Sequence, residues 1–549
     1  MRRNILLGVL AFAMGTALPV QARPQAESAA PTTVPKRLRV DISPREDTLH
    51  IEYVFPANCQ TIPLETRPAA EANISGEPGF TIDAAGFAWL ETAPSRSIEV
   101  RPDTARTNAE YPVLTKVGDG WLIFLPALTA DPEADDIRYR LPKDWIVLEG
   151  PGLSPRLGFV FMGPPETIES PFPGLIVDPG VSTEIVNLVR AETSSTLDEL
   201  ERKLGVARPS SPLVAVSNLP ALSGEAYVGD VTPNGVVNLQ FLVSAQLTEA
   251  LSVEIRRFIA HEMFHVWNGR NFIAAEPGEG RWLTEGSAEY VALRLAEEAS
   301  PGGAIVTGDK LVHSLNDCLN KLPPGTGVAA ARGDLAEAIR YSCGVAVQWL
   351  ADLKLHAERP DESYFSIWGS LFQQPAYTTS DFRQRFAADT ETSHGLYALL
   401  DGDVDLRPRL LSSLETAAVP IALVPPSNDH WILKIAGALH QNLCPDVGGV
   451  GGSGGRWWIH ASSDCDGLGT QPAIMSVLGI PIADGGPTLF EMVRQKCEAA
   501  EPVEVTLRGS GRSETREVQC SSIPEPPQAR FQLVTRATDP SPTKTTQAY

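Results

Sequence analysis

The segment EIRRFIAHEMFHVWNGRNF, residues 254–272, constrains the fold of this chain more than any other part of it. Its apolar spacing belongs to a helix predicted over 247–268, in which His261 and His265 stand four residues apart, on one face and one turn from each other. Two neutral imidazoles so placed can bind one zinc ion, and Glu262 can reach a water on that metal and take its proton. The alternative is an ordinary helix with two surface or core histidines.

A third ligand is available in RWLTEGSAEYVALRLA, where Glu285 opens a helix predicted over 284–299. Packed beside the first helix, this second helix would present Glu285 to the metal and leave one coordination position for water, as a catalytic site requires. Glu289 lies one turn further along the same face. It is predicted to accept a hydrogen bond from a zinc-bound histidine and to fix its tautomer. The chain has only 9 histidines, so this combination rarely arises by chance.

Length and charge limit the remaining possibilities. A chain of 549 residues with 43% hydrophobic residues is too long for one ordinary core, which predicts two to four domains. The formal net charge of -22 disfavours nucleic acid and anionic membranes as partners. The sequence does not determine the oligomeric state.

The N-terminus is typical of a secretory signal peptide. Arg2 and Arg3 precede the apolar run ILLGVLAFAMGTALPV, and small residues follow up to Ala22. We therefore expect cleavage after Ala22 and a secreted or periplasmic protein, with a retained N-terminal anchor as the alternative. No later stretch of the sequence is apolar for long enough to cross a bilayer.

Seven cysteines fit an oxidising compartment. None has CxxC spacing, which disfavours a cysteine zinc site. Up to three disulfides are possible, with one cysteine such as Cys59 left over, and the sequence does not assign the pairing. Buried free thiols are the other interpretation.

Composition changes along the chain predict a multidomain protein. After the signal peptide (1–22) and a flexible Pro/Ala/Thr-rich lead-in (23–36), short alternating runs indicate a β-rich domain over 37–165. Strand-like segments followed by several helices then favour an α+β catalytic domain over 170–415. A linker at 416–428 leads to a β-rich region over 430–522 with one helix, and 523–549 is predicted to be a disordered tail.

The residues around the predicted metal site resemble those of a known group of enzymes. HEMFHVWN followed by WLTEGSAEY is similar to the gluzincin metallopeptidases, and most of all to the glycyl-aminopeptidase family. The resemblance implies an N-terminal β domain, a thermolysin-like catalytic domain and a C-terminal PDZ domain. It also implies zinc ligands at His261, His265 and Glu285, a general base at Glu262, and a peptide or protein substrate.

Two further features follow from the resemblance. IRYSCGVAVQWLADL is similar to the Tyr-x-x-Gly helix start of related gluzincins, which implies that Tyr341 stabilises the oxyanion. Relatives also carry an amine-binding glutamate on the strand before the metal helix. Here the comparable strand is predicted to read NGVVNLQF, with Asn238 and Gln240 but no acid. The amine-binding acid therefore looks absent, and both aminopeptidase and endopeptidase action stay open.

The C-terminal region resembles half of a PDZ domain, through AIMSVLGIPIADGGPTLFEMVRQKC and VEVTLRGSG. Such a domain binds peptides at a sheet edge. The sequence thus predicts a zinc metallopeptidase. The alternative is a catalytically inactive, peptidase-like protein that binds peptides through this domain.

Overall fold

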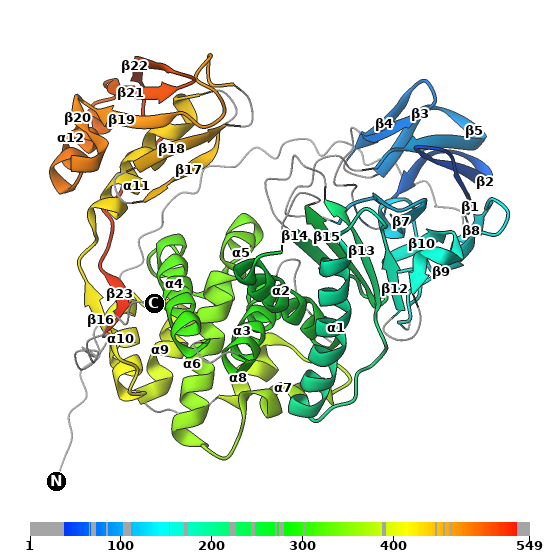
Figure 1. The fold of residues 1–549 in the computed structure, drawn as a ribbon, viewed down its shortest axis with the longest axis horizontal. Helices are drawn as coiled ribbons and strands as arrows, with labels where there is room; N and C mark the ends of the chain where they lie inside the picture. Colours follow the sequence, from blue (N-terminus) through cyan, green and yellow to red (C-terminus); the bar gives the residue numbers. More distant parts are fainter. Residues whose placement is uncertain are drawn as a thin grey trace, which may run out of the picture.

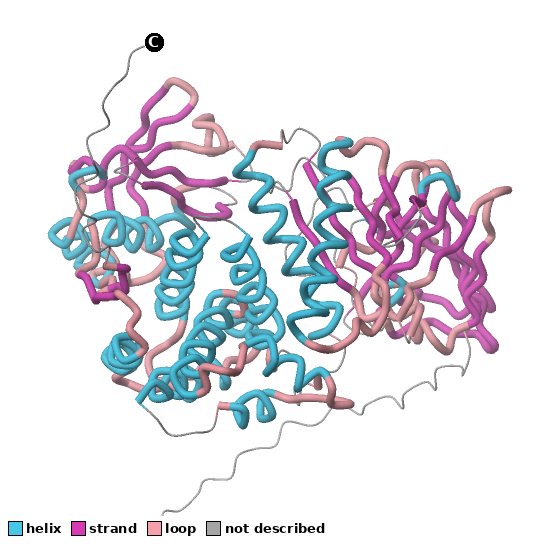
Figure 2. The backbone as a smooth tube through the Cα atoms, turned by 60° about the horizontal axis from the view of Figure 1, so that its bottom comes forward, coloured by secondary structure: helices cyan, strands magenta, loops and turns pink. Residues whose placement is uncertain are grey.

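The computed structural model describes residues 38–534, and within that range it leaves out 65, 67, 69–72, 84–85, 103–110, 153, 170–173, 220–226, 243–246, 270–271, 274–278, 300–302, 387–390, 445–446, 454–455 and 462–463. The predicted signal peptide with cleavage after Ala22 and the lead-in 23–36 lie outside the described residues. Three hydrophobic cores form in the described part, so the chain is a multidomain, mixed α/β protein. Figure 2 shows a helical domain between two strand-rich domains.

The N-terminal domain consists of two antiparallel-rich sheets that share one core. The first sheet has the order β3-β5-β2-β1-β8, with β4 paired to β5, and the second has the order β6-β7-β10-β9. Their bounds are β1 (Arg39–Pro44), β2 (Leu49–Pro63), β3 (Ile74–Gly76), β4 (Phe80–Asp83), β5 (Gly86–Val100), β6 (Leu114–Val117), β7 (Gly120–Phe124), β8 (Asp136–Tyr139), β9 (Ile146–Leu148) and β10 (Phe159–Gly163).

A five-stranded sheet joins this domain to the helices (Figure 1). Its order is β11-β12-β13-β15-β14, in which β12, β13 and β15 are parallel and β14 runs antiparallel at one edge. Its strands are β11 (Ile168–Glu169), β12 (Gly174–Val177), β13 (Leu213–Leu219), β14 (Tyr227–Val231) and β15 (Val236–Leu242). Because side chains alternate along a strand, Ala215 and Val236 enter the N-terminal core, whereas Val214, Val216 and Val237 enter the helical core.

The second face of this sheet packs against the helical domain, since Val214, Val216 and Val237 lie in its core. The helices of this domain are α1 (Thr183–Leu204), α2 (Glu249–Asn268), α3 (Arg281–Ala299), α4 (Gly303–Lys321), α5 (Gly333–Ile339), α6 (Ser342–Glu358), α7 (Tyr364–Phe372), α8 (Thr379–Arg385), α9 (Glu391–Asp401) and α10 (Leu406–Thr416). Helices α5 and α6 follow each other closely and meet at Arg340 and Tyr341. None of the described helices combines the length and apolar character needed to span a bilayer.

The C-terminal domain has its own core under a sheet of the order β17-β18-β19-β21-β22, with β20 paired to β19. Two helices, not the single one predicted, pack on it. The bounds are α11 (Asn428–Leu439), β17 (Val447–Ser453), β18 (Arg456–Ala461), β19 (Ala473–Val477), β20 (Ile480–Pro481), α12 (Pro487–Glu498), β21 (Val503–Gly509) and β22 (Arg512–Val518). The PDZ-like interpretation of this domain stays a prediction.

The predicted linker and the predicted disordered tail contact each other. Within 416–428, β16 (Ile421–Val424) pairs antiparallel with β23 (Arg530–Leu533), which lies within 523–549. Phe531 is buried in the helical core, and its backbone N–H and C=O both bond the amide of Asn316. The prediction of disorder is therefore wrong for residues 530–533. A few apolar residues are enough to form a strand here, because β16 offers a partner strand and the helical core accepts Phe531.

Three disulfides connect Cys318 to Cys343, Cys444 to Cys465 and Cys497 to Cys520. The first ties α4 to the start of α6 in the helical domain, and the other two lie in the C-terminal domain. The sequence had left this pairing open, since Cys spacing alone carries no distance information.

Candidate metal centre

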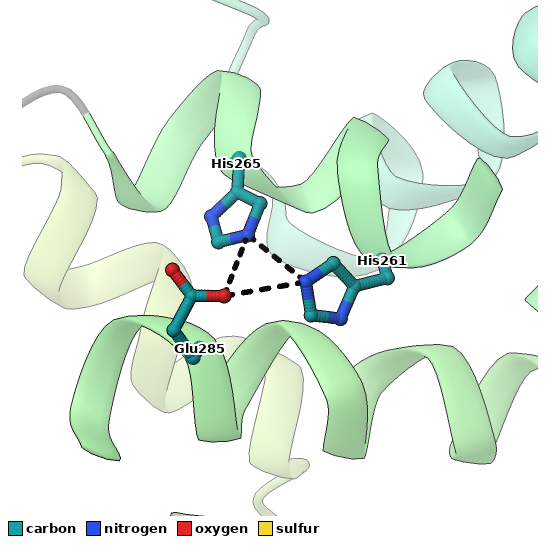
Figure 3. Close-up of side chains that lie close together, drawn as sticks. All are labelled: His261, His265 and Glu285. Atoms are coloured by element: carbon teal, nitrogen blue, oxygen red, sulfur yellow. Dashed lines mark hydrogen bonds and ion pairs between the residues drawn. The ribbon is translucent and has the colours of Figure 1, made fainter. Parts of the chain in front are cut away.

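Helix α2 carries the first part of the centre. Its N-terminus is capped by Thr248, whose hydroxyl accepts the N–H of Leu251 at 3.2 Å. Ile255, Ile259 and Met263 are fully buried in the helical core and fix the rotation of the helix. This rotation leaves His261 and His265 on the side that faces α3 (Figure 3).

Helices α3 and α6 approach each other through two glycines. A Cβ added to Gly286 would lie 2.2 Å from the Cα of Gly344, so any larger residue would push the two helices apart. Gly286 follows Glu285, and Gly344 lies three residues after Tyr341. The contact between these two glycines therefore brings Glu285 and Tyr341 close together.

The three residues predicted as metal ligands lie together (Figure 3). The two Nε2 atoms of His261 and His265 are 3.1 Å apart. Oε2 of Glu285 lies 3.5 Å from Nε2 of His261 and 3.6 Å from Nε2 of His265. Two imidazole nitrogens and one carboxylate oxygen thus converge from two helices, which is the donor set of a catalytic zinc site.

Each imidazole has an acceptor on its other nitrogen. Oε2 of Glu289 lies 3.3 Å from Nδ1 of His261, as predicted for this residue. Oδ1 of Asn268 lies 2.8 Å from Nδ1 of His265. Because carboxylate and amide oxygens only accept, each Nδ1 donates its hydrogen, which leaves each Nε2 as the nitrogen that would bind a metal.

Asn268 is a residue that sequence reasoning missed. Its Nδ2 donates to the backbone oxygen of Thr284 at 2.8 Å and to Oγ of Ser287 at 3.0 Å, so its oxygen is fixed toward His265. It is fully buried. Its position three residues after His265, on the same helix face, was the available signal.

Electrostatics favour a cation at this centre. Burial alone would lower the pKa of His261, but hydrogen bonds with Glu285 and Glu289 and the charge of Glu262 outweigh it and raise the pKa to about 10. Burial opposes ionisation of Glu285, yet the charges and hydrogen bonds of His265 and His261 hold its pKa well below the usual range. Three carboxylates around two imidazoles stabilise added positive charge, which a divalent ion supplies.

Glu262 follows His261 on α2 and is 6% exposed. Strand β14 passes beside it, since a Cβ added to Gly229 would lie 3.1 Å from Cδ of Glu262 and 2.4 Å from Cζ of Phe258. The missing side chain of this glycine leaves room for the ends of the Phe258 and Glu262 side chains. The candidate base therefore lies between the histidine pair and the edge of the sheet.

Tyr341 stands at the junction of α5 and α6, with its ring centroid 5.9 Å from that of His261. Its side chain is 43% exposed, and the guanidinium of Arg340 lies 4.9 Å from the ring. Desolvation and the Glu285 carboxylate raise its pKa above the usual value. Tyr341 is therefore a neutral O–H donor beside the histidine pair.

A cavity of about 300 Å³ adjoins the centre between α3, α4 and α6. Glu289 and Tyr341 lie on its lining together with His313, Asp317 and Lys321 of α4. Nζ of Lys321 pairs with Asp317 at 2.7 Å, so this wall is polar.

The strand that borders the centre is not the one predicted. Residues 236–242 form β15, which lies inside the sheet between β13 and β14, and its Asn238 is fully buried. The edge strand is β14, and it places the acid Asp230 opposite Asn238. The overlooked signal was the Asn-Gly pair at 234–235, where Gly235 has a φ of 80° and the chain reverses between the two strands.

No protein-family model matches this sequence, and no curated protein is similar enough in sequence to match it. Among solved structures, an aminopeptidase N family protein from Idiomarina loihiensis aligns over 90% of this chain and 98% of its own, at 11% identity and a TM-score of 0.48. A variant M1 zinc metallopeptidase from Deinococcus radiodurans aligns over 67% of this chain and 94% of its own, at 14% identity and a TM-score of 0.42.

Native LTA4 hydrolase from yeast aligns over 67% of each chain, at 12% identity and a TM-score of 0.40. All three superpositions are loose and their identities are low. They assign neither a family nor a reaction to this chain, and its function rests on the residues of the site.

Proposed function

We propose that this protein is a zinc-dependent hydrolase of peptide bonds. One observation carries the proposal: Nε2 of His261, Nε2 of His265 and a carboxylate oxygen of Glu285 converge beside the acid Glu262. The outer nitrogen of each histidine is held by Glu289 or Asn268, as is usual for histidines that bind a metal.

The donor set favours zinc over other common ions. Calcium and magnesium prefer oxygen ligands, whereas two imidazoles with one carboxylate suit zinc. Among the described residues, this is the one group of three or more His, Cys, Asp or Glu side chains close enough together to hold a metal.

The protein's own residues have distinct tasks in the proposed reaction. His261, His265 and Glu285 would hold a zinc ion, which would supply Lewis-acid chemistry to the substrate carbonyl and would make the attacking water more acidic. Glu262 takes a proton from that water and later gives it to the leaving nitrogen. Tyr341 donates a hydrogen bond to the oxygen that gains negative charge.

The edge of β14 supports a peptide as the substrate. An extended peptide binds most simply by adding a strand to an exposed edge, and β14 is the last described strand of its sheet. Gly229 brings this edge next to Glu262. A peptide aligned there has its backbone amides beside the proposed base.

Export stays part of the proposal. The sequence at 1–22 is typical of a signal peptide, and the three disulfides support an oxidising compartment. Whether a cell exports the protein can be tested by detecting a mature form that begins after Ala22.

Zinc content and peptide cleavage test the proposed function together. The wild-type protein should bind one zinc ion and cleave members of a mixed peptide library. Glu262→Gln should keep the zinc, because the residue is not a ligand, and should lose activity by orders of magnitude. Bound zinc with no cleavage of any peptide would instead favour a peptidase-like protein without catalysis, and full activity of Glu262→Gln would exclude the assigned base.

A further inference from the structure

The disulfide between Cys318 and Cys343 lies next to the candidate centre. Cys343 is in the first turn of α6, two residues after Tyr341 and directly before Gly344, which contacts Gly286 of α3. Cys318 is on α4, and both α4 and α6 line the cavity beside the centre. Both cysteines are fully buried. The bond therefore joins two helices of the cavity wall at the turn that follows Tyr341.

The position of Tyr341 depends on the backbone that carries it. The residue lies in the short junction between α5 and α6 and is 43% exposed. Its ring has the guanidinium of Arg340 at 4.9 Å and the ring of His261 at 5.9 Å as neighbours. Its backbone oxygen accepts the N–H of Val345 at 2.8 Å, which ties it to the first turn of α6. A shift of that turn would therefore move the Tyr341 hydroxyl.

Two consecutive residues fix this turn from different sides. Successive residues of an α-helix are rotated by about 100°, so Cys343 and Gly344 face different neighbours. Gly344 lies against α3, because a Cβ added to it would be 2.4 Å from the backbone oxygen of Trp282. Cys343 is bonded to α4. The packing contact limits how closely α6 approaches α3, whereas the covalent bond keeps the turn from moving away from α4.

Helix α4 is a firm support for this bond. Its Leu315 and Leu319 are buried in the helical core. The side-chain amide of Asn316 bonds the backbone N–H and C=O of Phe531 in β23, each at 2.8 Å. Cys318 follows Asn316 by two residues, in a segment that the core and β23 both hold. The disulfide therefore connects the junction of α5 and α6 to a fixed part of the domain.

We propose that the Cys318–Cys343 disulfide is a positioning element for Tyr341, which keeps the phenol hydroxyl where it stabilises the oxygen that gains charge. The inference rests on the proposed function, in which Tyr341 is that donor. The proposed zinc ligands lie on α2 and α3, so the bond should affect turnover and not metal binding. A misplacement of about 1 Å can cost roughly a hundredfold in rate, so even a small shift is measurable.

Removal of the bond tests this role. In the Cys318→Ala/Cys343→Ala protein, kcat should fall about tenfold, while zinc content stays at the wild-type level and KM changes by less than about twofold. The matched control is Cys497→Ala/Cys520→Ala in the C-terminal domain. It removes a disulfide of similar sequence separation, 23 against 25 residues, so the two proteins should lose similar stability. The control should keep the wild-type kcat.

Combination with Tyr341→Phe shows whether the bond acts through this hydroxyl. Removal of Cys318 and Cys343 should lower kcat about tenfold when Tyr341 is present and by less than about twofold in the Tyr341→Phe protein. An equal loss in both backgrounds, or a wild-type kcat in the folded Cys318→Ala/Cys343→Ala protein, would overturn the inference. If that protein does not fold, Cys318→Val/Cys343→Ala replaces it, because valine fills more of the space that the sulfur atoms leave.

Hydrogen exchange separates this inference from the proposed reaction. Removal of the Cys318–Cys343 bond should speed exchange of the backbone amides of 341–345 at least about tenfold, as measured by mass spectrometry, and leave those of 261–265 unchanged. Removal of the control disulfide should change neither segment.

Faster exchange in a protein whose wild type cleaves no peptide would overturn only the proposed reaction. Cleavage with unchanged exchange and unchanged kcat would overturn only the positioning role. Neither cleavage nor a change in exchange would overturn both.

Discussion

On the helix side of the candidate centre, both histidines come from α2, and each is held by a second residue on α2 or α3. Glu289 holds His261, and Asn268 holds His265. On the strand side, Gly229 of β14 lies beside Glu262, and the hydroxyl of Tyr111 in the N-terminal domain donates to the backbone oxygen of Val231. The first side joins residues within about thirty positions of the sequence, whereas the second joins segments more than a hundred positions apart.

Metal binding and substrate positioning therefore depend on different parts of the molecule, although one activity assay measures both together. Under the proposed function, metal binding depends on the helices α2 and α3, so substitutions there should change zinc content first. Under the proposed function, the edge of β14 positions a peptide beside Glu262, so substitutions there should leave zinc in place. Four variants test this division, in order of decreasing effect.

Glu285→Ala should have the largest effect. It removes one of the three proposed ligands from a half-buried position, and the two remaining imidazoles should hold zinc weakly. We expect loss of bound zinc by mass spectrometry and at least a roughly thousandfold loss of activity. Glu337→Ala, an acid on α5 that pairs with Arg281 and Arg340, is the control and should keep its zinc. Full zinc content in Glu285→Ala would place the metal elsewhere.

Tyr341→Phe should reduce kcat by roughly a hundredfold at unchanged zinc content, because it removes one hydrogen-bond donor from the developing charge and no ligand. Steady-state kinetics measure the effect. Tyr364→Phe removes a buried hydroxyl that bonds Gln348 at 2.7 Å and should lower stability without a specific loss in kcat. Equal kcat values in Tyr341→Phe and the wild type would rule out the oxyanion role.

Asn268→Ala should weaken zinc binding by roughly 10- to 100-fold, since His265 loses the acceptor that orients its ring. Competition with a fluorescent chelator measures the affinity. Asn268→Asp keeps an acceptor oxygen and should retain most of the affinity. A zinc affinity that is the same in Asn268→Ala as in the wild type would mean that packing alone positions the imidazole.

Gly229→Ala should have the smallest effect, about a tenfold loss in kcat/KM with normal zinc content. The added methyl group displaces the Phe258 ring and the Glu262 carboxylate, which are flexible at their far ends. Gly437→Ala on α11 meets no atom within 4 Å and serves as the control. A loss of zinc in Gly229→Ala would show that the strand also supports the metal, and the division between the two sides would not hold.

Much of the site could be predicted from the sequence because its spacing is local. His261 and His265 lie on one face of a single helix, and Glu262 lies three residues before His265, so helix periodicity places all three near one point. Glu289 follows from Glu285 by the same periodicity. Asn268 has the same helical spacing, three residues after His265. It was missed because an asparagine at a helix end has many structural roles.

The strand side could not be predicted in this way. The run 236–242 precedes the metal helix in the sequence, so the resemblance implied that it borders the site. Its apolar residues instead place it inside the sheet. The pairing of β16 with β23 joins residues more than a hundred positions apart, and no local pattern of either segment indicates the other.

The sequence by itself determined the chemistry of this protein's candidate centre: which side chains stand on one helix face, and that their donor atoms suit zinc. Only the tertiary structure decided which strand borders that centre and that Tyr111 of another domain bonds this strand. Side-chain periodicity acts over one or two helical turns, whereas strand order and domain contacts arise from burial of apolar surface between distant segments, which a linear pattern does not encode.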